Sequence, residues 1–257
     1  MRSILLAICA ALVVGGALLA AGATTPSRLA VPAATNSVDA GDKGAFGKRI
    51  REYLMANPEV LVEAMQELER KQDSQRDAVA QKAIRQHKDE LLADPEAPFG
   101  GNASGDVIVV DFNDYQCPYC KRAHQALKSV VAADGKVKVV YKDLPILGEP
   151  SRIAALAALA SVKQGKHQAF HDALMEFNGK LDRARILEIA ASVGLDVALL
   201  EKDMEDPKFK QLIERNMALA GALGVRGTPA FVIGEQFAPG AIDAGTLKQM
   251  IAEARKR

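Results

Sequence analysis

The stretch VIVVDFNDYQCPYC, residues 107–120, decides the fold of this 257-residue chain. Its apolar run from Val107 to Phe112 is typical of a buried strand, and a helix-compatible segment follows over residues 121–131. Cys117 and Cys120 stand between the two, so the strand delivers a cysteine pair to the first turn of a helix. That is the arrangement which thiol–disulfide chemistry needs.

The composition indicates a globular protein without a general polyanionic partner. Hydrophobic residues make up 49% and charged residues 25% of the chain, which suits one large or two ordinary folded domains. Arg2 is the one charged residue among the first 23, so 32 basic residues face 32 acidic residues beyond them. This balance gives no case for binding nucleic acid or an anionic membrane.

The N-terminus has the pattern of a secretory signal peptide over residues 1–23. Arg2 precedes an apolar run over residues 4–20, and Ala21-Gly22-Ala23 supplies a small-residue cleavage site, which predicts export and cleavage near Ala23. A membrane anchor is the alternative, but a run of about 17 residues is at the short limit for crossing a bilayer. Cys9 lies inside this run and is expected to leave with the signal.

The mature chain then keeps Cys117 and Cys120 as its cysteines. Exported proteins stabilised by disulfides normally use several pairs, and a pair two residues apart closes too small a loop to add much stability. Reactivity is the better explanation. Cys117 is the predicted nucleophile because a helix N-terminus stabilises its thiolate, Pro118 suits the first helical position, and Cys120 can resolve a mixed disulfide.

Metal binding is the main competing interpretation of these residues. A structural zinc site needs four ligands, and the mature chain has no second cysteine pair. His124 follows Cys120 by four residues, but a solvent-facing or locally bonded histidine is favoured. His167 and His171 share a helix face but lack the glutamate of the zinc-protease motif. His87 belongs to no metal-binding pattern.

The region before the cysteines divides into a leader and a helical arm. Residues 24–44 are rich in small residues and predict a flexible leader. Residues 45–93 predict helices with a restart at Asn57-Pro58, where Asn57 is the expected N-cap. The stretch over residues 69–77 has no apolar side chain and is considered as a hinge. A long projecting helix with an apolar stripe favours self-association over folding back.

Residues 94–257 predict an α/β domain interrupted by helices. A turn cluster at residues 100–105 precedes the first strand, and Val137–Tyr141 is the second strand of a crossover unit. Residues 149–224 predict an inserted helical subdomain with Ser151 as a helix cap. A strand over residues 230–233, a hairpin and a final helix then complete the sheet.

The motifs FNDYQCPYCKR (residues 112–122) and GTPAF (residues 227–231), with the helical insertion between them, resemble the DsbA-like branch of the thioredoxin superfamily. The resemblance implies a thioredoxin fold with an inserted helical domain, here preceded by an N-terminal helical oligomerisation arm. It also implies a cis peptide bond between Thr228 and Pro229 next to the cysteines. Pro118, Tyr119, Thr228 and Pro229 are then expected to form the active-site loop that binds substrate.

The arm, with Asn57-Pro58-Glu59-Val60-Leu61, resembles the suppressor of copper sensitivity protein C group. This resemblance implies a periplasmic disulfide isomerase that forms homotrimers through residues 45–92 and can bind copper(I), for which Cys117 and Cys120 are the soft ligands. No cofactor is required. The strongly oxidising DsbA pattern has histidine where this chain has Tyr119, so a higher pKa of Cys117 and a less oxidising pair are expected.

The predicted activity is isomerisation of misfolded or misoxidised exported proteins, which requires a membrane thiol reductase to keep the pair reduced. A monomeric dithiol oxidase of DsbA type and a copper(I)-binding protein are the alternatives. A passive structural adaptor is disfavoured because it leaves the lone cysteine pair without a task.

Overall fold

The computed structural model describes residues 40–256 of the chain. The expected signal peptide and residues 24–39 of the expected leader lie outside the described residues. The chain divides into two compact units, residues 1–58 and 59–257. Within the described part, no helix has both the length and the apolar character needed to cross a membrane.

The first unit contains one described helix, α1 (Ala40–Ala56). The expected boundary of the leader at Gly44 is therefore wrong, because the helix already includes residues 40–44. Adding residues to the end of an existing helix costs far less than nucleating one. Asn57 is also not the predicted N-cap: its backbone and side-chain amides both donate to the carbonyl of Tyr53, at 2.8 Å, so it caps the C-terminal end of α1.

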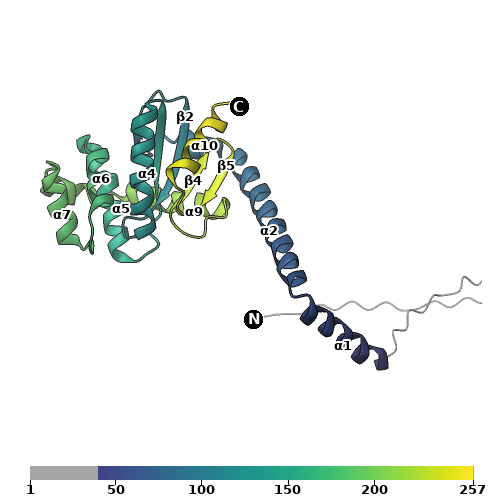
Figure 1. Ribbon diagram of the computed structural model, residues 1–257. Coiled ribbons are helices and arrows are strands. Elements are labelled where there is room, and N and C mark those ends of the chain that lie inside the picture. Colours follow the sequence, from purple (N-terminus) through teal and green to yellow (C-terminus); the bar gives the residue numbers. More distant parts are fainter. Residues whose placement is uncertain (1–39, 257) are drawn as a thin grey trace, which may run out of the picture. The chain divides into compact units, whose positions relative to one another are not determined.

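The second unit begins with α2 (Glu59–Gln86) and α3 (Lys88–Leu92). The hinge considered at residues 69–77 is not a break, because α2 is continuous through it, and the interruption lies at His87. Polar residues with good helix propensity sustain a solvated helix there. Figure 1 shows α2 extending away from the sheet beside β5, and its C-terminal part alone is buried, at Ala80, Ala83 and Ile84.

The sheet has five strands in the order β1-β3-β2-β4-β5: β1 (Phe99–Gly101), β2 (Val107–Asn113), β3 (Val137–Asp143), β4 (Ala230–Ile233) and β5 (Gln236–Pro239). The pair β2–β3 is parallel and the other neighbours are antiparallel. The predicted turn at residues 100–101 is wrong, since Gly100 and Gly101 pair with Val139 and Lys138 in β1. A Cβ on Gly100 would collide with the Gln168 side chain, so glycine marks a close approach there.

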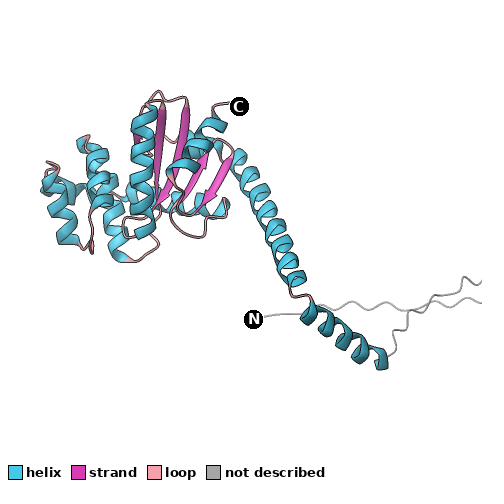
Figure 2. Cartoon of the chain, in the orientation of Figure 1, coloured by secondary structure: helices cyan, strands magenta, loops and turns pink. Residues whose placement is uncertain are grey.

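Helices cover both faces of this single sheet (Figure 2). Side chains of β2 alternate between the faces: Val107 and Val109 pack with α4 (Pro118–Asp134) and α10 (Ala244–Ala254). Val110 and Phe112 pack on the other face with the end of α2, α3 and α9 (Pro207–Ala222). The buried ammonium of Lys142 on β3 binds Asp94 at 2.6 Å, which fixes the chain after α3.

The insertion comprises α5, η1, α6, α7, α8 and most of α9. These elements are α5 (Glu149–Ser161), η1 (Val162–Gln164), α6 (His167–Glu176), α7 (Arg183–Ser192) and α8 (Val197–Met204). The side chains of Asp196 and Asp206 cap α8 and α9. Ser151 is not the predicted cap: α5 begins at Glu149, after Gly148, and Ser151 is fully buried in its first turn.

The core of the insertion extends to the cysteines. Buried side chains of α5 to α9 form one cluster with Tyr115, Cys117 and Cys120. The helix α9 joins this cluster to the sheet, because Leu212 packs in the insertion while Leu219 packs against the strands. The insertion therefore forms one wall around the cysteine pair.

Candidate active site

Two free thiols lie at the start of α4. Cys117 is the N-cap residue, with an extended backbone conformation (φ −78°, ψ 117°), and Pro118 occupies the first helical turn. Cys120 follows in that turn. The side chains are 4% and 2% exposed, respectively. The helix N-terminus thus presents unpaired backbone N–H groups next to Cys117.

The two thiols differ in acidity. The hydrogen bond with the Cys120 side chain, the Cys120 and Tyr119 backbone N–H groups and Thr228 lower the pKa of Cys117 to about 5, against the opposing effect of burial. Burial, followed by the bond to Cys117, raises the pKa of Cys120 well above its ordinary value. At neutral pH Cys117 is therefore the thiolate and Cys120 the thiol, which is the division of roles that nucleophile and resolving cysteine require.

The loop before β4 completes the site from the far end of the chain. In the protonated state the Sγ of Cys117 donates to the carbonyl oxygen of Thr228 at 3.2 Å, and the peptide bond between Thr228 and Pro229 is cis, as the resemblance implies. Tyr119 is 56% exposed, with the Arg122 guanidinium 4.5 Å from its ring centroid. All six residues named as site residues from the sequence lie either at the start of α4 or in the adjoining loop before β4.

Asp114 and Gln116, which precede the cysteines, hold the loop in place by hydrogen bonds to the surrounding protein. The buried carboxylate of Asp114 accepts hydrogen bonds from the backbone N–H groups of Gln116, Ile146 and Leu147 at 2.8 to 3.1 Å. The side chain of Gln116 donates to the carbonyl of Leu181 in the insertion at 2.8 Å. The position of Cys117 is thus held from both the sheet and the insertion.

Buried carboxyl groups near the pair were missed at the sequence level. Asp111, in β2, is 3% exposed with no hydrogen-bond partner for its Oδ1, and burial raises its pKa to about 7. Asp143, at the end of β3, has its pKa raised to about 8, chiefly by burial. The charge of Asp111 contributes to the raised pKa of Cys120. An acidic residue inside an apolar strand, six positions before the nucleophile, was the available signal.

The prediction that His124 faces solvent or bonds locally is wrong. His124 is 4% exposed, because α6 covers the face of α4 that carries it. His167 and His171 share a face of α6, as predicted, but that face is buried as well. These histidines lie in a separate cluster from the thiols.

Comparison with known proteins places the chain among thiol–disulfide proteins. It matches the DSBA-like thioredoxin domain over residues 108–252 and the copper resistance protein ScsC N-terminal domain over residues 42–75. A thioredoxin-like oxidoreductase from Silicibacter pomeroyi is 48% identical, with a TM-score of 0.65, over 66% of this chain and 98% of that one. Proteus mirabilis ScsC in a transitional conformation is 30% identical, with a TM-score of 0.63, over 86% of this chain and 98% of that one.

Curated relatives also include much longer proteins. The Na(+)/H(+) antiporter NhaA 3 of Salinispora tropica is 29% identical over 135 residues, which are 52% of this chain. The match spans 21% of the antiporter's length. The similarity therefore concerns one part of that protein.

Proposed function

Because the chain belongs to the DsbA-like thioredoxin domain family of thiol–disulfide oxidoreductases, we propose that it is a periplasmic disulfide isomerase with Cys117 as its nucleophile. The observation that carries the proposal is the low pKa of Cys117, about 5, beside the Thr228 carbonyl. Export rests on the signal peptide expected over residues 1–23, cleaved near Ala23. The catalytic domain proposed is residues 94–257.

Attack by Cys117 is the first step. Its thiolate forms a bond to one sulfur of a substrate disulfide, and the other substrate sulfur leaves as a thiolate. A different substrate cysteine then attacks the mixed disulfide, which creates a new substrate disulfide and returns Cys117 as a thiolate. The cycle has no net oxidation, but it starts from the reduced pair. A membrane thiol reductase is therefore needed to reduce any disulfide that forms between Cys117 and Cys120.

Cys120 releases trapped adducts. Its sulfur attacks Sγ of Cys117, the substrate leaves as a thiol, and the pair becomes a disulfide. The thiol of Cys120 must lose a proton first, and its raised pKa makes a base necessary. Asp111, with a pKa of about 7 and its charge felt at Cys120, is suited to accept that proton.

The residues around the cysteine pair orient the substrate and tune the reactivity of Cys117. Pro118 and the exposed ring of Tyr119 border Cys117, while Thr228 and Pro229 offer backbone groups to an extended substrate segment. Tyr119 supplies no positive charge to the thiolate, which favours reduction and shuffling over oxidation. The substrates are misfolded or misoxidised exported proteins.

Self-association as a homotrimer through residues 45–92 is the second part of the proposal. The segment matching the ScsC N-terminal domain carries exposed apolar side chains at helical spacing. They are Phe46, Ile50 and Tyr53 on α1 and Leu61, Met65 and Leu68 on α2, each 44 to 70% exposed. Apolar stripes of this kind are stabilised by burial against copies of themselves.

Refolding of a scrambled multi-disulfide substrate tests the catalytic proposal. The reduced wild type is expected to restore substrate activity, Cys117→Ser to restore none, and Cys120→Ser to retain isomerisation while accumulating covalent adducts. Full activity of Cys117→Ser would overturn the role of Cys117. Efficient oxidation of reduced substrate without isomerisation would favour the dithiol oxidase.

Light scattering tests the oligomer. Leu61→Glu, Met65→Glu and Leu68→Glu together should reduce the mass to that of a monomer, because charges cannot be buried in an apolar interface. Gln66→Glu with Arg70→Glu adds the same charge on the opposite, exposed face of α2 and should leave the mass unchanged. A monomeric wild type would end the trimer proposal.

Copper(I) binding by Cys117 and Cys120 is a second candidate function, favoured by the match of the arm to a copper resistance protein domain. Two reduced, hydrogen-bonded thiols form a donor set that suits this soft ion. Competition with a copper(I) chelator should show binding that Cys117→Ser abolishes. No binding by the reduced wild type would remove this candidate.

A further inference from the structure

A second group of polar side chains, two of them buried and one partly exposed, lies between α4 and α6. His124 comes from α4, and His171 and Asp172 come from α6. One ligand atom of each, from the imidazoles and the carboxylate, lies within 4.8 Å of the others. The rings of His124 and His171 meet edge to face with centroids 5.2 Å apart. Three ligand-type side chains therefore converge on one point.

Three of the four ring nitrogens of His124 and His171 lack hydrogen-bond partners. Both nitrogens of His124, which is 4% exposed, and Nε2 of His171, which is fully buried, are unsatisfied. A buried polar atom without a hydrogen-bond partner destabilises the folded state, so two adjacent imidazoles left in this state call for a ligand.

We propose that His124, His171 and Asp172 bind a divalent zinc ion. The Nε2 of His124 is 3.5 Å from Oδ1 of Asp172, close to the spacing of about 3.3 Å between two ligands of a tetrahedral zinc ion. Two imidazoles and a carboxylate form a known zinc donor set. This set is chemically distinct from the two thiols and needs neither of them.

The hydrogen bond of His171 sets which of its ring nitrogens is available to bind a metal ion. Its Nδ1 is 2.9 Å from the hydroxyl of Tyr115. With Nδ1–H donating to that oxygen, Nε2 carries the lone pair and is the nitrogen left without a hydrogen-bond partner. Outer contacts of this type set the tautomer of metal-bound histidines. Tyr115 lies two residues before Cys117, so the zinc site also supports the loop that holds the nucleophile.

Asp172 has other partners that the ion must compete with. Its Oδ2 binds the ammonium of Lys128 at 2.9 Å and its Oδ1 accepts from Gln168 at 2.7 Å. The Lys128 side chain is 47% exposed and also binds Glu176 at 2.6 Å. Lys128 can therefore keep its contact with Glu176 while Asp172 turns to the ion.

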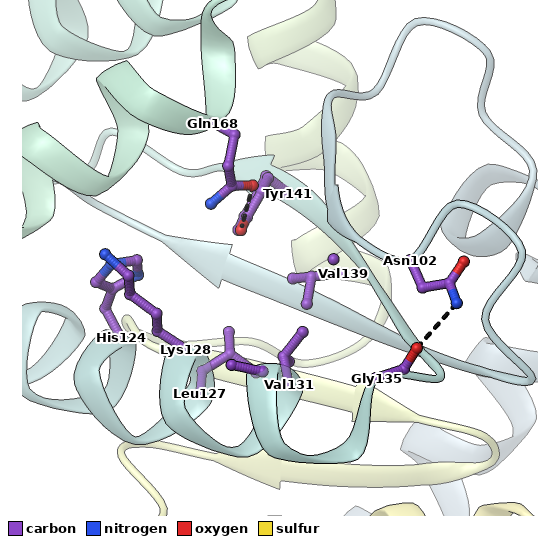
Figure 3. A pocket seen from close by; sticks show the side chains of 11 residues that line it. Asn102, His124, Leu127, Lys128, Val131, Gly135, Val139, Tyr141 and Gln168 are labelled. Atoms are coloured by element: carbon purple, nitrogen blue, oxygen red, sulfur yellow. Dashed lines mark hydrogen bonds between the residues drawn. The ribbon is translucent and has the colours of Figure 1, made fainter. Parts of the chain in front are cut away.

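A pocket of about 380 Å³ opens next to the proposed site. Figure 3 shows His124 and Lys128 side by side at one end of it, while Tyr141 and Gln168 lie on another wall. Three protein ligands leave the fourth zinc position free, as in zinc sites that keep a water or an exogenous ligand. Of the three proposed ligands, His124 lines this pocket.

Zinc titration of the full chain without a polyhistidine tag tests the site. A Cys117→Ser and Cys120→Ser background removes the thiols as ligands and makes the result independent of the proposed isomerase activity. Competition with a chromophoric chelator should show one zinc ion per chain, and zinc should raise the melting temperature. Cobalt(II) should give the visible absorption of a tetrahedral complex.

Variants in that background assign the ligands. His124→Asn and Asp172→Asn should each weaken zinc binding by at least about tenfold, while circular dichroism verifies folding. His87→Asn is the matched control, because His87 is a partly exposed histidine that binds Glu90 away from the site, and it should leave affinity unchanged. No binding in the background protein, or binding that survives both ligand substitutions, would overturn the proposal.

Discussion

The thiol of Cys117 donates a hydrogen bond of 3.2 Å to the carbonyl oxygen of Thr228, a residue 111 positions later in the chain. The insertion separates the two in sequence, and the antiparallel pairing of β4 with β2 returns Thr228 to the start of α4. The Thr228 side chain also lowers the pKa of Cys117, so the acidity of the nucleophile depends on both halves of the interrupted domain.

Alkylation should discriminate between the two thiols. Because the pKa of Cys117 is about 5, iodoacetamide is expected to modify Cys117 at a rate that levels off above roughly pH 6, while Cys120 stays unmodified. Peptide mass spectrometry identifies the labelled residue. Cys120→Ala removes the largest stabilising contact of the thiolate and should shift the profile to higher pH. A wild-type midpoint near the pKa of free cysteine would contradict the geometry.

Replacement of Asp111 should slow resolution by Cys120. Asp111→Asn keeps the shape of the side chain but removes the base, so release of a mixed disulfide is expected to fall on the order of a hundredfold. Single-turnover mass spectrometry of the adduct measures this step. Attack by Cys117 should change little, which separates the effect from misfolding. Equal slowing of both steps would argue against Asp111 as the base.

Tyr119→His should make the pair more oxidising. An imidazolium beside the thiolate lowers the pKa of Cys117, and a shift of one pKa unit corresponds to about 30 mV in the reduction potential. Equilibration with glutathione buffers measures that potential. Tyr119→Phe retains the aromatic ring over Arg122 and is expected to match the wild type. A potential unchanged by histidine would show that position 119 does not set the redox balance.

The sequence predicted those strands and helix starts that depend on residues within a few positions of them. The apolar run over residues 107–112 forms β2, and Pro118 begins α4, as predicted. The cysteine spacing and the resemblance of residues 227–231 predicted that the thiols and Thr228 lie next to each other. These signals work because each lies within a few residues of the structure that it specifies.

Long-range packing accounts for what the sequence did not reveal. The strand β1 is defined by pairing with β3, about 40 residues later. Its two glycines are typical of turns, so the sequence predicted a turn there. His124 is buried because α6 covers α4, which no helix periodicity could indicate. The role considered for Asp111 likewise depends on the distance between β2 and Cys120 in the folded chain. Each depends on a neighbour that is remote in sequence.

Acid should destabilise the fold because the buried histidines of α6 become protonated on unfolding. A variant of His167 measures the contribution of one of them. Burial lowers the pKa of His167 from 6.5 to about 4, so the unfolded state binds more protons between these values. The stability contributed by neutral His167 is complete above pH 6.5 and is lost as the pH falls towards 4. His167→Phe removes this proton uptake and fills the same apolar surroundings.

Urea unfolding in the presence of a metal chelator measures the difference. From roughly pH 8 to roughly pH 5, the free energy of unfolding should fall by about 2 kcal/mol more in the wild type than in His167→Phe. Asp111 and Asp143 have raised pKa values and change stability in the opposite direction, but they are common to both proteins and cancel in the comparison. Parallel pH profiles for the two proteins would show that His167 is already protonated or solvated in the folded state.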